Sequence, residues 1–137
     1  MALTLYSLDQ KAHDLVLEFR DTGALKQVFK MRSTAVYGLE RFWGEPLRLN
    51  NHEARYWRRT WDVLKEVVAL AGVMLPGSST NTITTDQIHT ITEELWNAEN
   101  VEQRQVSLAV LVHLCDAMVW WTQRYKTAND DLNTDDN

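Results

Sequence analysis

The chain has 137 residues, the length of one domain, and its 45% hydrophobic and 24% charged residues are ordinary for a globular protein. A formal net charge of −5 argues against unspecific binding to nucleic acid, and a single cysteine excludes an intrachain disulfide. Only 5 glycines and 2 prolines interrupt the chain, so we expect long helices joined by few loops. The first residues lack the pattern of a signal peptide, and a reducing cytoplasm is therefore the expected location.

Helical spacing of apolar residues begins near the N-terminus. Residues Ser7 to Gln10 have the pattern of a capping box, and the apolar positions after them predict a first helix that ends at Gly23. A second helix is expected from Ala24 to Trp43, because Pro46 and its neighbours stop it.

Two further helices are predicted in the middle of the chain. Asn50 opens the third helix, whose long apolar face is expected to run to Pro76 and Gly77. Residues Thr84 to Gln87 form a second capping-box pattern, and the narrow apolar stripe after them predicts a short fourth helix that ends near Asn97.

The most apolar stretch runs from Val101 to Lys126 and predicts a fifth helix. Its apolar core from Leu108 to Trp121 is too short to span a bilayer, and its apolar residues cover more than half of the helix circumference, so we expect other helices to surround it. Residues 128–137 contain four aspartates and are expected to form a disordered acidic tail. The expected fold is all-α, a single-domain bundle (residues 1–127) of about five helices around this central C-terminal helix.

Basic residues are concentrated in the middle of the acidic chain. Residues 24–65 hold nine basic and four acidic residues, a local excess of five positive charges. Arginine side chains suit carboxylate or phosphate partners, so we expect a partner-binding surface made of Lys30, Arg41, Arg55, Arg58 and Arg59. The alternative is a solvated helix face, because Asp62 lies one turn from Arg58 and Arg59 and can neutralise them.

Polar residues within apolar stripes are the second candidate site. Arg32 falls inside the apolar side of the second helix, where it either forms an ion pair or a subunit contact, or reaches water through a bend. His113, Asp116 and Trp120 lie at i, i+3 and i+7 on the polar arc of the last helix. Either the first or fourth helix covers them and His113 and Asp116 form a buried pair, or they form an interface with a subunit or partner.

No residue pattern supports catalysis, a cofactor or a metal. The chain has no phosphate-binding loop, Cys115 lies on the apolar side of its helix, and two Asp/His pairs at i, i+3 do not make a four-ligand site. The sequence therefore favours a non-enzymatic interaction or regulatory module that binds a protein with an acidic surface. A metal-dependent helical-bundle enzyme is a minor alternative.

Two further expectations concern partners. Six tryptophans exceed what a core of this size requires, which favours a homodimer, and no membrane partner is expected. The runner-up function is a nucleic-acid-binding subunit of a ribonucleoprotein. In outline the chain is similar to small helical subunits of RNA-guided effector complexes and to small helical regulators that dimerise, a likeness of architecture that identifies no residue.

Overall fold

The computed structural model describes residues 5–77, 83–97 and 101–127. Within them 78% of the residues are helical and none forms a strand, which confirms the all-α class. In chain order the elements are α1 (Leu5–Phe19), α2 (Gln27–Ala35), α3 (Leu39–Gly44), the 3₁₀ helix η1 (Glu45–Arg48), α4 (Asn51–Ala69), α5 (Thr85–Trp96) and α6 (Val101–Tyr125).

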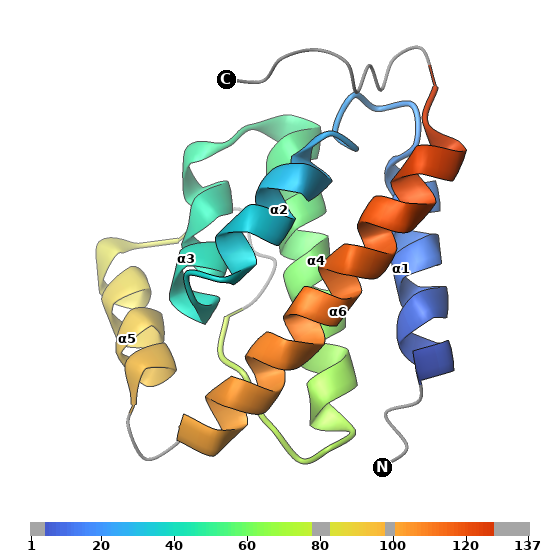
Figure 1. The fold of residues 1–137 in the computed structure, drawn as a ribbon. Helices are drawn as coiled ribbons and strands as arrows, with labels where there is room; N and C mark the ends of the chain where they lie inside the picture. Colours follow the sequence, from blue (N-terminus) through green and yellow to red (C-terminus); the bar gives the residue numbers. More distant parts are fainter. Residues whose placement is uncertain (1–4, 78–82, 98–100, 128–137) are drawn as a thin grey trace.

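α6 is the longest helix and packs mainly against three others. Its main contacts are with α1, α2 and α4, so that α1 and α2 flank it on its two sides while α4 lies behind it (Figure 1). α1 and α6 run in the same direction, because Asp9 contacts Trp121 and His13, one turn later, contacts Tyr125. α5 lies at the edge of the fold against α3 (Figure 1).

The core is centred on the inner side of α4. Tyr56, Trp57 and Leu64 are completely buried, as the helical spacing of this apolar face predicts. The indole Nε1 of Trp57 donates to Gln27 Oε1 at 2.8 Å, and that of Trp61 donates to the carbonyl of Pro76 at 2.9 Å. The two buried indole donors are therefore satisfied, and they fix α4 against the start of α2 and the loop that follows α4.

The second predicted helix is wrong in extent, because it is two helices. α2 ends at Ala35, and the chain turns through Gly38, whose φ of 119° is open to glycine but strained for other residues. α3 begins directly afterwards, and the amide of Phe42 donates to the carbonyl of Gly38 at 3.2 Å. A break at Gly38, rather than a bend near Arg32, therefore separates the two apolar segments.

Three other boundaries bear on the sequence predictions. α4 ends at Ala69 and not at Pro76, because Gly72 adopts a φ of 82° and the amide of Val73 donates to the carbonyl of Val68 at 3.0 Å.

The two predicted capping boxes have different outcomes. α1 begins at Leu5, so the box expected from Ser7 does not cap it. The capping box of Thr84 is confirmed, with Gln87 N 3.2 Å from the threonine Oγ1. The predicted acidic tail lies outside the described residues.

Candidate interaction surfaces

Two outward surfaces contain the residues singled out by the sequence. The arginine strip is the outward side of α4 and consists of Arg55, Arg58 and Arg59. The α6 face is the outward side of α6 and consists of Val106, Ala109, His113, Asp116 and Trp120, all of them exposed.

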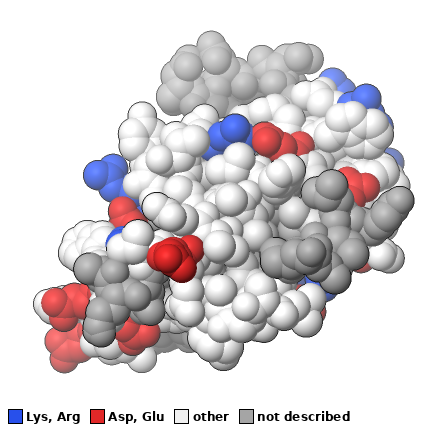
Figure 2. Space-filling view, turned by 60° about the horizontal axis from the view of Figure 1, so that its bottom comes forward, with Lys and Arg blue, Asp and Glu red and all other residues white. Residues whose placement is uncertain are grey.

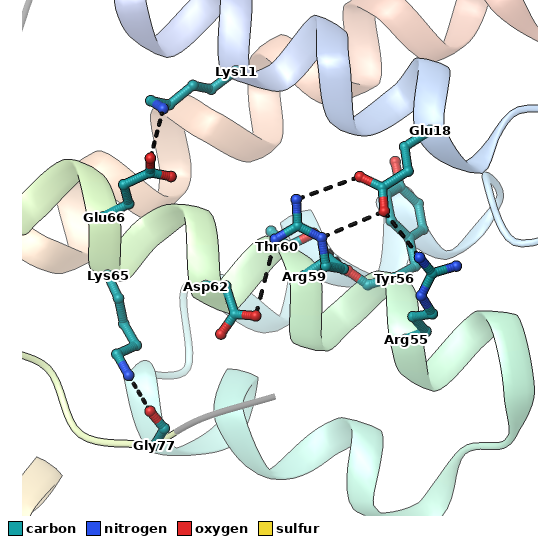
Figure 3. Close-up of polar contacts among 10 residues, drawn as sticks. All are labelled: Lys11, Glu18, Arg55, Tyr56, Arg59, Thr60, Asp62, Lys65, Glu66 and Gly77. Atoms are coloured by element: carbon teal, nitrogen blue, oxygen red, sulfur yellow. Dashed lines mark hydrogen bonds and ion pairs between the residues drawn. The ribbon is translucent and has the colours of Figure 1, made fainter. Parts of the chain in front are cut away.

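A carboxylate from another helix neutralises much of the arginine strip. Glu18 of α1 accepts from Arg55 Nη2 at 3.3 Å and from Arg59 Nε at 3.4 Å, as Figure 3 shows. The guanidinium of Arg59 also lies 4.0 Å from Asp62, and that of Arg55 lies over the ring of Phe19, 5.2 Å from its centre. Two of the three arginines therefore join α4 to α1, a role that the sequence alternative of neutralisation within the helix did not include.

The other two predicted basic residues belong to different elements. Lys30 projects from α2, with its Nζ 3.8 Å from a Glu45 carboxylate oxygen that Arg48 also contacts. Arg41 is exposed on α3. Both side chains are at the surface, and Lys30 has a carboxylate partner of its own.

The α6 face is not covered by the described chain. Trp120 is 50% exposed and Val106 is 40% exposed, while His113 and Asp116 between them are also exposed. The expectation that α1 or α5 covers Trp120, with His113 and Asp116 as a buried pair, is therefore wrong. α1 lies to one side of this arc, and α5 lies against α3 instead.

Arg32 reaches the α6 face from α2. Its Nε donates to Asp116 Oδ1 at 2.6 Å, and the two side chains are 36% and 58% exposed. Of the two sequence alternatives, the ion pair is present, but it is partly exposed instead of buried. The pair joins α2 to α6 in the middle of the α6 face.

An open groove runs along the side of the α6 face next to α1. Its volume is 590 Å³, and it is lined by Leu8, Asp9, His113, Asp116, Ala117, Trp120 and Trp121. Trp121 closes one wall, since its Nε1 donates to Asp9 Oδ1 at 3.0 Å. Trp120 stands beside it with its ring edge-on to Trp121 at 4.7 Å, and the guanidinium of Arg124 lies 3.8 Å from the centre of the Trp120 ring. These contacts hold a half-exposed indole in a defined position.

The sequence analysis did not anticipate a contact of His13 that packs against Trp121, one of the residues lining the groove. His13 Nε2 lies 2.7 Å from the hydroxyl of Tyr125, and the His13 ring stands edge-on to Trp121 at 4.7 Å. Asp9 and His13 are one turn apart on α1, and Trp121 and Tyr125 are one turn apart on α6. These matched spacings were the available signal, but they become informative only once the two helices are known to be parallel neighbours.

Metal-binding and reactive groups are sparse in the described ranges. No group of three His, Cys, Asp or Glu side chains gathers there, and His89 pairs with Glu93 at 3.5 Å on the exposed side of α5. Burial raises the pKa of the Cys115 thiol to about 12, so it carries almost no thiolate at neutral pH.

α6 is unusually apolar for a helix with an open side. Its 25 residues exceed the short run on which the sequence argument against a span rested, and by length and composition alone the helix could cross a membrane. A core helix passes the same test, and α6 packs against α1, α2 and α4, but only 33% of its most apolar window is buried. From the lower end of the bundle, the surface is largely uncharged, with scattered acidic and basic groups (Figure 2).

Comparison with known proteins adds no assignment. No family model, no curated protein and no solved structure matches the chain.

Proposed function

We propose that this chain is a non-enzymatic protein-interaction module that binds its partner through the α6 face. The observation that carries the proposal is Trp120, half-exposed beside an open groove on the uncovered side of the most apolar helix. Tryptophan at the centre of an interface often contributes much of the binding energy. Arg124 and Trp121 already position the indole, so little side-chain freedom is lost when a partner covers it.

The arginine strip gives weaker support to an acidic protein or a nucleic acid as the partner. An anionic ligand at Arg55 and Arg59 has to compete with Glu18, which already contacts both guanidinium groups. Nucleic acid releases its bound counterions when basic side chains contact its phosphates, and side chains already paired with a carboxylate do this less well. A nucleic-acid-binding subunit is therefore only the second candidate.

The test is affinity capture with the full chain from native lysate, with and without nuclease. Wild type is compared with Trp120→Ala and with the matched control Trp96→Ala, which removes another exposed tryptophan (58%) from α5. We expect one stoichiometric protein, other copies of the chain included, to be retained by wild type and the control and lost by Trp120→Ala. Equal recovery from all three would contradict the proposal.

The same experiment separates the second candidate. The double variant Arg55→Glu, Arg59→Glu should leave capture through the α6 face unchanged. Recovery that disappears with nuclease and with this double variant would instead support nucleic-acid binding through the arginine strip.

A further inference from the structure

We infer that the α6 face binds a second copy of this chain, with the two α6 helices antiparallel and Trp120 of each copy in the groove of the other. The inference rests on the proposed function and names the partner of that same surface. Three features of the described residues support it: the shape of the groove, the spacing of the exposed residues and the position of one ion pair.

The groove and the side chain that fits it lie on the same helix. Trp120 projects beside the groove, and His113 and Ala117, seven and three residues earlier, line it. A twofold axis beside Asp116 and Ala117 places Trp120 of one copy opposite His113 and Ala117 of the other. A twofold axis makes this contact twice, so one tryptophan and one groove per chain are sufficient. Ala117 has no side chain beyond Cβ and leaves room for the incoming indole.

The exposed residues of α6 have the spacing of a helix–helix seam. From Val106 to Gln123 they fall alternately three and four residues apart, and all the remaining residues of this stretch are buried or half-buried within their own chain. Outside it, Gln105 and Arg124 are exposed as well. This average period of 3.5 residues is the one at which two long helices remain in contact along their length. The exposed members are Val106, Ala109, His113, Asp116, Trp120 and Gln123.

The ion pair of α2 and α6 lies close to the proposed axis. Arg32 and Asp116 contact each other at 2.6 Å but keep 36% and 58% of their side chains exposed, so each can accept a second partner. Across the axis, Asp116 of one copy approaches Arg32 of the other. The two ion pairs thereby join into one cluster in which two arginines and two aspartates alternate. The surface therefore complements itself in charge, which favours a copy over a partner that lacks such a pair.

The available area matches what a dimer requires. An antiparallel overlap from Val106 to Thr127 is about 32 Å long at 1.5 Å per residue. Because packed helices lie about 8–10 Å apart, the face that includes the adjoining edges of α1 and α2 is about 16–20 Å wide and measures on the order of 600 Å² per copy, the lower end of the roughly 600–1,000 Å² per partner of a standard interface. That area is under a tenth of the 7957 Å² surface of the chain.

The first test is sedimentation equilibrium of the full chain. We expect wild type and Trp96→Ala to be dimeric at micromolar concentration, and Trp120→Ala to raise the dimer dissociation constant at least about 30-fold, as loss of a central interface residue does. Circular dichroism checks that each variant is folded. A wild type that is monomeric at about 100 μM, or a Trp120→Ala dimer of unchanged affinity, would overturn the inference.

The second test is cross-linking, which does not depend on removing Trp120. Ala117→Cys lies beside the axis and should give covalent dimers with a short bis-maleimide. Gln105→Cys is exposed on the same helix but about 18 Å from the axis, and should give none. Wild type is the blank, because its single cysteine, Cys115, is completely buried. Cross-linking of Gln105→Cys and not of Ala117→Cys would overturn the antiparallel register.

The two proposals fail in different ways. If wild type is monomeric but Trp120→Ala still loses a different captured protein, the copy is not the partner and the interaction module stands. If a variant without residues 2–4 becomes dimeric while wild type is monomeric, the chain ahead of α1 occupies the groove, and the inference fails for wild type. If the monomer binds neutral lipid vesicles and Trp120→Ala abolishes this binding, the α6 face contacts a membrane, and both proposals are overturned.

Discussion

The outward sides of α4 and α6 differ in how far the chain itself satisfies them. On α4, Arg59 contacts both Glu18 and Asp62, and Arg55 shares Glu18 and covers Phe19. On α6, Trp120 and Val106 leave 50% and 40% of their surfaces in water although the other sides of the helix are packed.

A surface that is easily recognised in the sequence is not necessarily free to bind a partner in the folded chain. A run of arginines stands out in the sequence, yet a carboxylate from another helix already neutralises two of them. The last helix has the composition of a core element, yet one side of it remains uncovered, with Val106 and Trp120 exposed among polar residues. Binding surfaces are better recognised by groups that still lack partners than by composition alone.

The largest expected contrast is between two tryptophan truncations, one on each helix. Trp57 is completely buried and Trp120 is half-exposed, so Trp57→Ala should lower the free energy of unfolding by about 3–5 kcal/mol, and Trp120→Ala by less than about 1 kcal/mol. Urea denaturation at a concentration where the chain is monomeric measures both. A loss of several kcal/mol in Trp120→Ala would mean that Trp120 has a structural role instead of a binding role.

The packed side of α6 should produce a pH dependence through Cys115. Burial is the main cause that raises its pKa from 9.0 to about 12. Above pH 9 the thiol ionises in the unfolded chain while it stays protonated in the folded one. The stability that Cys115 contributes is therefore fully present below pH 9 and is lost as the pH rises towards 12. The slope is at most about 1.4 kcal/mol per pH unit. The stability of wild type relative to Cys115→Ala should therefore shrink between pH 8 and 10.5. A difference that is constant over this range would contradict the raised pKa.

A buried hydroxyl on the same side of α6 should be dispensable. Ser107 is completely buried, and within the described residues its Oγ has no hydrogen-bond partner. Ser107→Ala removes this unsatisfied group and raises helix propensity, so we expect about 1 kcal/mol of added stability in urea denaturation. Ser107→Val is the control, since its added volume should destabilise the same site. A destabilised alanine variant would show that the hydroxyl has a partner in solution.

The smallest expected effect on stability concerns the arginine strip. Glu18→Gln removes the carboxylate shared by Arg55 and Arg59, which are 58% and 38% exposed. Because such partly exposed pairs contribute little, we expect a loss of about 0.5–1 kcal/mol at low salt that diminishes at high salt. The variant should also bind a heparin column more tightly than wild type. The control is Asp14→Asn, which removes one negative charge elsewhere on α1. If both variants elute from heparin at the same higher salt concentration, the tighter binding reflects only the net charge.

The helical class and the inner faces followed from local pattern, and the contacts between helices did not. Periodicity in the sequence was sufficient to predict one long apolar face on α4, where Trp57 and Trp61 are buried, and the capping-box pattern was sufficient to place Thr84 at the start of α5. The break between α2 and α3 was missed because apolar spacing continues across Gly38, and only its positive φ shows that the helix must stop.

The candidate surfaces required information that local sequence does not contain. Glu18 lies 37 and 41 residues from the arginines that it contacts, and nothing in its neighbourhood marks it as their partner. The sequence identified Trp120 and Asp116, but whether their side of α6 is covered depends on where α1 and α5 pack. Those positions are set by contacts among several helices, which periodicity along one helix does not specify.

The parallel course of α1 and α6 has a practical consequence for fusion proteins and affinity tags. The chain enters α1 next to Leu8 and Asp9, at the wall of the groove, whereas it leaves α6 beyond Tyr125, near Asp21. A tag placed ahead of residue 5 therefore starts on the side of the groove and should hinder binding there. A tag placed after residue 127 starts about two helical turns beyond Trp120, at the end of the proposed dimer overlap, and is the better choice for immobilisation and for fluorescent labelling.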